Sequence, residues 1–90
     1  MNTKVNKQET NEELNKRLYL AEFKYFDGEE YITFNIVDID LDNMNITVAI
    51  TNRGRISVIT YDLLRDGDCL YFEYGYFYEQ IEINNFMEVA

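Results

Sequence analysis

The chain has 90 residues, a net charge of −9 and 16% aromatic residues, and its single cysteine excludes an internal disulfide. This length corresponds to one small domain, and no apolar run reaches the roughly 18 residues of a membrane span. The polar first 17 residues contain no apolar core of a secretory signal, so we expect a cytoplasmic protein.

Negative charge is concentrated in the later part of the chain. Residues 27–90 carry thirteen acids and three bases, whereas residues 1–26 carry four acids and five bases. Such a field repels nucleic acid and anionic membranes and attracts basic surfaces. We therefore expect neither direct nucleic-acid binding nor membrane binding. The alternative is that the charge serves only solubility.

The first predicted elements are a disordered tail and a short helix. Residues 1–9 are mostly polar and are expected to be disordered, and residues 10–90 are expected to form a single small β-rich domain. Thr10 and Glu13 have the spacing of a capping box, while Leu14 and Leu18 lie one helical turn apart. This pattern predicts a helix over about 11–17.

Alternating apolar residues predict antiparallel strands from residue 18 onward. A hairpin turn of type I′ is expected at Asp27-Gly28, because glycine accepts the positive φ that this turn requires. In the strand that follows, the apolar parity changes at Ile36-Val37. A change of this kind predicts a bulge or a sharp bend that keeps the apolar side inward.

The middle of the chain predicts a second hairpin. Residues 46–51 form a clean strand with the even-numbered apolar side chains facing inward. The turn Asn52-Arg53-Gly54 leads into a strand over 55–64, in which Ile56 and Val58 are expected to match that inward set. Arg53 and Arg55 flank the turn and form either a local positive spot or ion pairs with neighbouring acids.

Turn signals at Asp66-Gly67-Asp68 and at Gly75 separate the last strands. Turns therefore recur along the whole chain, and the sequence contains no internal repeat. The fold class that follows is mainly β, with α+β at the margin. It is an antiparallel meander of five or six strands, curled or barrel-like, with one short N-terminal helix.

Three acids alternate in the stretch VDIDLDN, at Asp38, Asp40 and Asp42, as at the start of a calcium loop. An EF-hand loop requires glycine at its sixth position and glutamate at its twelfth, where Asn43 and Ala49 stand, so no metal site is predicted. Alternate strand residues lie about 6.8 Å apart. The phosphates of one DNA strand advance about 3.4 Å per nucleotide, so a row of this spacing can imitate every second phosphate. The alternative is a solvated strand face that resists aggregation.

Six aromatic residues fall among the eight positions 71–78. Strand alternation assigns Phe72 and Tyr74 to the core, together with one of Tyr76 or Phe77. A domain this small cannot bury all six, so the remaining aromatic side chains are expected at the surface.

The exposed aromatic side chains form a candidate contact surface. Tyrosine provides rigid contact area with a polar tip, and neighbouring acids suit a basic partner through stacking on arginine and charge pairing. A self-dimer through the same patch is the alternative. The members of this cluster are Tyr71, Tyr76 and Tyr78, flanked by Glu73 and Glu79.

The residues of a catalytic site are not apparent. The chain has no histidine, which excludes Ser-His and Cys-His nucleophile pairs. Ser57, the only serine, lies in the middle of a predicted strand. Cys69 stands beside Asp66 and Asp68, and acidic surroundings do not favour a reactive thiolate. The four glycines are isolated, so no phosphate loop and no cofactor are predicted, and we expect no enzyme.

With its acid row and tyrosine cluster, the chain resembles small acidic single-domain proteins of phages and mobile elements, including anti-CRISPR inhibitors and DNA-mimic anti-restriction proteins. The resemblance is in size, charge, β-rich pattern and a composition rich in Asn, Ile, Lys and Tyr. It implies an inhibitor that occupies a basic nucleic-acid-binding groove of a host defence protein. The alternative is a self-associating structural or accessory protein of a mobile element. The expected contact residues are Asp38, Asp40, Asp42, Asp66, Asp68, Glu73, Tyr76, Tyr78 and Glu79.

Overall fold

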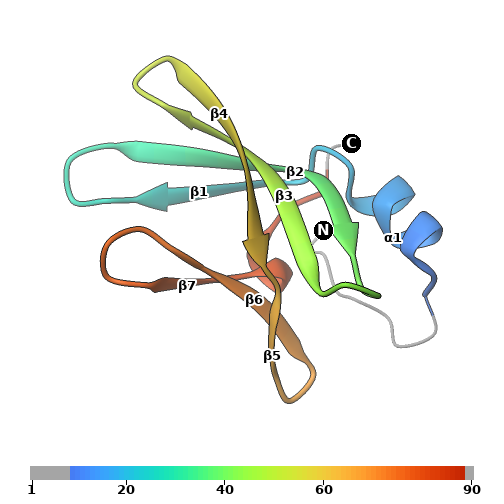
Figure 1. Ribbon diagram of the computed structural model, residues 1–90. Coiled ribbons are helices and arrows are strands. Elements are labelled where there is room, and N and C mark those ends of the chain that lie inside the picture. Colours follow the sequence, from blue (N-terminus) through green and yellow to red (C-terminus); the bar gives the residue numbers. More distant parts are fainter. Residues whose placement is uncertain (1–8, 89–90) are drawn as a thin grey trace.

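Two antiparallel β-sheets and one short helix make up residues 9–88, the part of the chain that the computed structural model describes (Figure 1). Strands account for 56% of the structure, which confirms the predicted mainly β fold class, although the sheets do not close into a barrel. Residues 1–8 of the predicted tail lie outside the described range. The strands are β1 (Glu22–Phe26), β2 (Tyr31–Asp40), β3 (Asn45–Asn52), β4 (Arg55–Asp62), β5 (Leu64–Asp66), β6 (Cys69–Tyr74) and β7 (Glu79–Glu82).

The strands follow one another as a meander that is divided between the two sheets. The first sheet has the order β1-β2-β3-β4 and the second has the order β5-β6-β7. The strand predicted over 55–64 is in fact two strands, because the chain turns inward at Leu63. This side chain is only 3% exposed, and its N–H donates to the carbonyl of Met44 at 2.9 Å. The break explains why there are seven strands, where five or six were predicted.

Helix α1 (Asn11–Leu18) begins where the capping box predicts it. The Thr10 hydroxyl accepts a hydrogen bond from the Glu13 N–H at 3.1 Å, and the Glu13 carboxylate accepts one from the Thr10 N–H at 3.2 Å. Leu14 and Leu18, one turn apart, are fully buried. None of the described helices has the length and apolar character needed to cross a membrane.

Helix α1 also covers the part of the β2 edge that β1 leaves open. Strand β1 pairs with β2 only as far as Asn35. Beyond it, the Asn15 amide donates to the carbonyl of Ile39 at 2.7 Å and accepts from the N–H of Ile39 at 2.8 Å. The Asn11 side chain accepts from the N–H of Leu41 at 2.8 Å. These two asparagines satisfy the strand backbone where a neighbouring strand would otherwise be needed.

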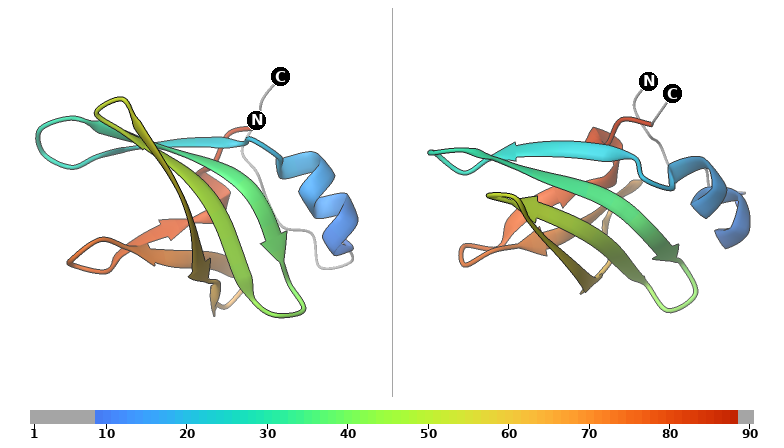
Figure 2. Two further views of the ribbon diagram at one scale, coloured as in Figure 1. Left: turned by 45° about the horizontal axis from the view of Figure 1, so that its top comes forward. Right: turned by 90° about the horizontal axis from the view of Figure 1, so that it is seen from above.

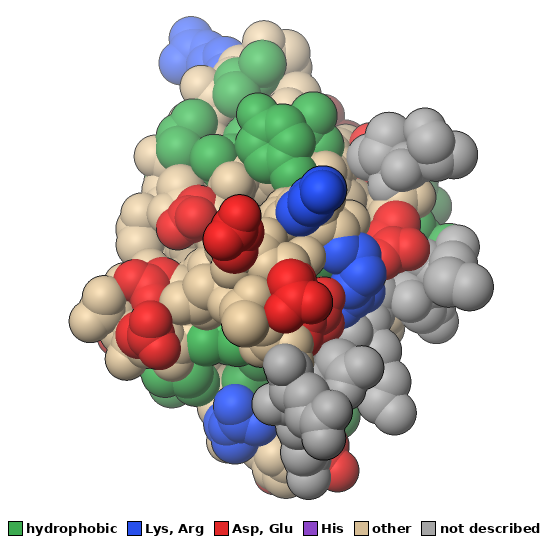
Figure 3. Space-filling model, turned by 90° about the vertical axis from the view of Figure 1, so that its right-hand side faces the viewer, with side chains coloured by type: hydrophobic (Ala, Val, Ile, Leu, Met, Phe, Trp, Pro, Cys, Tyr) green, Lys and Arg blue, Asp and Glu red, His purple; other side chains and the backbone are tan. Residues whose placement is uncertain are grey.

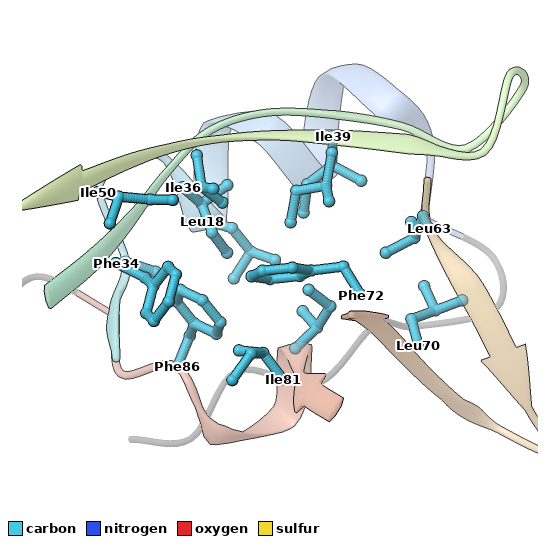
Figure 4. Close-up of a cluster of buried hydrophobic side chains, with 14 of the residues drawn as sticks. Leu18, Phe34, Ile36, Ile39, Ile50, Leu63, Leu70, Phe72, Ile81 and Phe86 are labelled. Carbon is cyan, nitrogen blue, oxygen red and sulfur yellow. The ribbon is translucent and has the colours of Figure 1, made fainter. Parts of the chain in front are cut away.

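The core lies between the two sheets and is built around three phenylalanines (Figure 4). Phe34 from β2, Phe72 from β6 and Phe86, which follows the 3-10 helix η1 (Ile83–Asn85), are fully buried. The ring centroids of Phe34 and Phe72 lie 5.8 Å apart, and those of Phe72 and Phe86 lie 6.4 Å apart. The burial of Ile46, Val48 and Ile50 confirms the inward set predicted for β3.

The irregularity predicted in β2 is present. The β2–β3 register shifts between Ile36 and Asp38, which face Val48 and Thr47 respectively. Because of this extra residue, Ile36 and Ile39 both point into the core although they are three positions apart. The change of apolar parity in the sequence was therefore a reliable sign of a bulge.

The β3–β4 turn corrects the prediction for β4. It consists of Arg53 and Gly54, with φ of 53° and 76°, where three residues were predicted. Positive φ at both positions is characteristic of a type I′ turn. The one-residue difference moves Ile56 and Val58 to the outer face, where they are 70% and 63% exposed. A slip of one residue exchanges every side chain between the two faces of a strand.

Candidate functional site

The three alternating acids do not present one continuous row of charge. Asp38 and Asp40 lie on β2 and face Thr47 and Asn45 of β3, whereas Asp42 lies in the turn between these strands. Asp38 and Asp42 are exposed, but Asp40 is partly covered. The row is therefore broken where the strand ends.

Asp40 is held by its own turn. Its carboxylate accepts hydrogen bonds from the Asn43 side-chain amide at 2.7 Å and from the backbone N–H groups of Asp42 and Asn43 at 3.0 and 3.1 Å. The Asn11 amide also lies 3.4 Å from Asp40 and 3.1 Å from Asp42. The bond from the Asn43 side chain is the main reason that the pKa of Asp40 is lowered. Asp40 thus stabilises the β2–β3 turn.

The other predicted acids lie in the second sheet and point in different directions. Asp66 and Asp68 flank Gly67 in the β5–β6 turn. Glu73 is exposed and alternates with the buried Phe72, so it points away from the core, whereas Glu79 pairs with Tyr74 on the opposite face of the hairpin. Figure 3 shows the acids on the α1 side of the molecule dispersed among basic and uncharged side chains. The acids among the expected contact residues are therefore spread over both sheets and their turns.

The β6–β7 turn presents three consecutive aromatic side chains to solvent. Tyr76, Phe77 and Tyr78 are 91%, 84% and 70% exposed. The prediction that one of Tyr76 or Phe77 is buried is wrong, because β6 ends at Tyr74 and strand alternation does not continue through a turn. Tyr71, which was also expected in the exposed cluster, is only partly exposed.

The backbone of this turn holds the aromatic side chains outward. Gly75 and Tyr78 both have positive φ, 78° and 53°, and the Tyr78 N–H donates to the Gly75 carbonyl at 3.3 Å. The left-handed conformation costs a residue with a Cβ roughly 1–2 kcal/mol. Tyr76 and Phe77 also contact each other edge to face, with centroids 5.7 Å apart. Strain of this kind is characteristic of functional positions.

The β1–β2 turn lies at the same end of the molecule and differs from the predicted type I′ turn. Its loop has four residues, 27–30, because Phe26 pairs with Tyr31. The Asp27 carboxylate accepts from the N–H groups of Glu29 and Glu30, each at 2.9 Å. The bond from Glu30 is the main reason that the pKa of Asp27 is lowered.

Three turns, 27–30, 53–54 and 75–78, point the same way in every view and define what we call the hairpin end (Figures 1 and 2). Tyr25 and Tyr74 connect two of these hairpins, with ring centroids 6.1 Å apart. Burial raises the pKa of Tyr74, and the charge of Asp27 raises it further. The exposed rings of Phe26 and Tyr31, 5.0 Å apart, lie at the base of the β1–β2 turn. The hairpin end therefore combines exposed aromatic and acidic side chains.

Arg53, one of the two arginines that flank Gly54 at the hairpin end, is paired with acids. The Arg53 guanidinium donates to the carboxylates of Glu30 and Glu29, the latter at 3.3 Å. The bond to Glu30 is the main reason that the pKa of Arg53 is raised. Exposed pairs of this kind contribute little stability. Their effect here is to offset the charge of Arg53, one of the two arginines in the positive spot that the sequence suggested beside Gly54.

Part of this surface was missing from the sequence-based prediction. Phe77 was assigned to one of two core alternatives, and Asp27, Glu29 and Glu30 were not expected beside the tyrosine cluster. The signal for Phe77 was the glycine before Tyr76, which ends the strand. The proximity of the two hairpins depends on how the sheets pack, and no local pattern encodes it.

Metal-ligating side chains do not gather anywhere within residues 9–88. No three His, Cys, Asp or Glu residues of this part are arranged so that they could hold a metal ion. Cys69 is partly covered, and its Sγ lies 3.9 Å from the side-chain amide of Asn84. No protein family, curated protein or solved structure matches this chain. Assignment of a function therefore depends on the residues of this chain.

Proposed function

We propose that this chain is a non-enzymatic, cytoplasmic protein-binding module and that the hairpin end is its binding surface. The observation that carries the proposal is the run Tyr76, Phe77 and Tyr78, with each side chain at least 70% exposed. Aromatic residues are concentrated in the energetically dominant parts of protein interfaces. A short turn that places three of them in water, one with a strained backbone, is better suited to contact than to stability.

The chemistry around the aromatic turn favours a basic partner. Glu73 and Glu79 flank it on the same hairpin, and the acidic β1–β2 turn, with Asp27, lies beside it. Aromatic faces attract arginine and lysine through cation–π contacts, and adjacent carboxylates pair with the same groups. The net charge of −9 attracts a basic protein over a longer distance and repels nucleic acid.

We further propose that the partner is a nucleic-acid-binding host defence protein, whose basic groove this chain occupies as a phage or mobile-element inhibitor does. The acids at the ends of β2 and β6 that lie away from the hairpin end contribute long-range attraction. They are Asp38, Asp42, Asp66 and Asp68. Asp40 acts in its turn and supports the fold.

The second candidate is a self-associating accessory protein of a mobile element. It is favoured by one observation, the exposure of Ile56 and Val58 on β4. Apolar residues on a strand at the edge of a sheet promote association. In this case the charge serves solubility and the aromatic turn has no foreign partner.

An affinity experiment in lysate of the native host tests the proposal. The baits are the unchanged chain, a variant with Tyr76→Ala, Phe77→Ala and Tyr78→Ala, and the control Tyr19→Ala, which removes an exposed tyrosine from the end of α1. We expect the unchanged chain and the control to retain a basic nucleic-acid-binding protein that elutes at moderate salt. The triple variant is expected to lose it.

The salt dependence of the captured complex tests the charge component. Replacing Glu73 and Glu79 by Gln is expected to weaken binding and to reduce the slope of log Kd against log salt concentration. The comparison variant replaces Asp66 and Asp68 by Asn at the other end of β6, which removes the same charge outside the proposed contact and is expected to change the slope less. Retention of the same protein by the triple aromatic variant contradicts the proposed surface. Recovery of only the chain itself favours the second candidate.

A further inference from the structure

The two edges of the four-stranded sheet differ in how they are protected. At the β1 edge, Glu22 exchanges two backbone hydrogen bonds with Met87, at 2.9 and 2.7 Å. The same edge also has the exposed Lys24, and a lysine on an edge strand discourages pairing with another chain. Within residues 9–88, no strand pairs with the other edge, which is β4.

Strand β4 has none of these protective features along its middle. Ile56 and Val58 are 70% and 63% exposed on its outer face, and Ile59 is 40% exposed on its inner face. No charged residue occurs between Arg55 and Asp62. A long apolar edge of this type is a template for pairing with another strand.

The type I′ turn determines which backbone groups are available on β4. In a two-residue hairpin, the residues that flank the turn, here Asn52 and Arg55, form a hydrogen-bonded pair. The odd-numbered residues of β4 therefore direct their N–H and C=O groups toward β3. The N–H and C=O groups of the even-numbered residues point away from β3. These residues, Ile56, Val58 and Thr60, are also the ones whose side chains lie on the outer face.

The charge around β4 favours a second copy of this chain as its occupant. The chain carries a net charge of −9, yet positions 43–61 contain no acid and two arginines. This edge is the part of the first sheet at which two such molecules can approach without opposing carboxylates. The strand also begins at Arg55 and ends at Asp62, so antiparallel pairing places opposite charges near each other at both ends.

We propose that β4 pairs with β4 of a second copy, antiparallel and about a two-fold axis, to form one continuous eight-stranded sheet. A two-fold axis perpendicular to a sheet pairs residues of the same face, and the free backbone groups of β4 all belong to outer-face residues. The geometry therefore allows Val58 to face Val58 of the second copy, with Ile56 facing Thr60. This dimer does not depend on the proposed partner at the hairpin end.

Sedimentation of the full chain over a range of concentrations tests the dimer. We expect a monomer–dimer equilibrium for the unchanged chain. Val58→Lys places like charges opposite each other across the axis and is expected to raise the dimer Kd about tenfold or more. The matched control is Tyr19→Lys, which places the same charge on a 58% exposed position at the end of α1, away from the β4 edge and the hairpin end. It is expected to leave the Kd unchanged.

Amide hydrogen exchange provides a second measurement that needs no variant. Protection of the amides of Ile56, Val58 and Thr60 is expected to rise with protein concentration, because the second copy covers them. The amides of Ser57 and Ile59 are expected to be protected at every concentration, since they bond to β3 within one chain.

Three results overturn the proposal. One is a monomer at concentrations up to about 1 mM, because weaker association is not specific. Another is a dimer that Val58→Lys leaves intact, which would place the interface elsewhere, for instance on the aromatic turn. The third is protection of the Val58 amide only when a foreign protein is added, which would make β4 a docking edge for that protein. If Val58→Lys does not fold, the exchange pattern of the unchanged chain decides.

Discussion

At Asp40, the side chain has a structural role that its position in an acidic row conceals. Hydrogen bonds, of which the one from the Asn43 side-chain amide has the largest effect, lower the pKa of the Asp40 carboxyl from the ordinary 3.8. The ionised group therefore stabilises the fold above pH 3.8, and this stabilisation is lost as the pH falls through the folded pKa. Asp40→Ala is expected to lower Tm by a few degrees at neutral pH, and by less in acid. Circular dichroism melts at both pH values measure this.

Asp38→Ala is the control for Asp40, because Asp38 is exposed on the same strand and lies two positions away. We expect it to change Tm little at either pH. Equal losses of stability in the two variants would show that the turn does not depend on the Asp40 carboxylate.

Tyr78 is the residue at which stability and binding are expected to conflict. Its φ of 53° is unfavourable for a residue with a Cβ and normal for glycine. Tyr78→Gly is expected to stabilise the fold by about 1 kcal/mol in urea unfolding, because it relieves this strain. It is also expected to weaken binding to the captured partner, because it removes a ring that is 70% exposed. A variant that is less stable, or that binds as well as the unchanged chain, would contradict this role.

At the scale of elements, the contact between α1 and β2 depends on two asparagine side chains. Asn15→Ala leaves the N–H and the carbonyl of Ile39 without their partners at 2.8 and 2.7 Å. Loss of such bonds at a partly buried site is expected to cost about 1–3 kcal/mol in urea unfolding. Alanine is the better helix former, so propensity alone predicts the opposite sign.

Lys16→Ala provides the comparison for Asn15, because Lys16 is exposed on the next position of the same helix. We expect its free energy of unfolding to remain within about 0.5 kcal/mol of the unchanged chain. If both variants lose the same stability, the effect belongs to the helix in general and not to the bonds with Ile39.

Local patterns predicted the elements better than they predicted the relations between them. The capping box at Thr10 and the parity change at Ile36 are both short-range signals, and both were confirmed. The prediction that Ile56 and Val58 of β4 face inward was wrong. Asn52 and Gly54 are both acceptable turn residues, so the sequence permits turns of two or three residues. Only the pairing of Thr51 with Ile56 decides between them.

For the candidate site as well, single residues were easier to predict than their relative positions. Exposure of Tyr76 and Tyr78 followed from the small size of the domain, which cannot bury so many rings. Convergence of the acids was not predictable, because it depends on which strand joins which sheet. The chain passes from the first sheet to the second at Leu63, and that step separates Asp66 and Asp68 from the acids of β2.

For the whole molecule, Phe72 is the side chain on which both sheets depend. It is fully buried. Its ring centroid lies 5.0 Å from that of Tyr61 and 5.8 Å from that of Phe34, and both of these residues belong to the first sheet. Phe72→Ala is expected to cost about 3–5 kcal/mol, through lost burial and the cavity that remains. Because the total free energy of unfolding of a domain is about 5–15 kcal/mol, this substitution removes a large part of it, and urea unfolding measures the loss.

Phe77→Ala is the matched control, because it removes the same ring five positions along the chain, where 84% of it is exposed. Its stability is expected to stay within about 0.5 kcal/mol of the unchanged chain. The pair therefore separates the stabilising phenylalanine from the one available for contact. A large loss of stability in Phe77→Ala would mean that the aromatic turn is part of the core.

The guanidinium of Arg17 binds Glu9 near one end of the described chain, at 2.8 Å, and Glu88 near the other end, at 3.0 Å. Two points 79 positions apart in sequence are thus brought within reach of a single side chain. Proteins with neighbouring ends tolerate circular permutation. A permutant in which a short linker joins residue 88 to residue 9, and which is opened at Gly67 in the exposed β5–β6 turn, is expected to keep the same three-dimensional arrangement. Its new ends would lie at the end of β6 opposite the hairpin end, so that the protein could be tethered to a sensor surface with the hairpin end exposed.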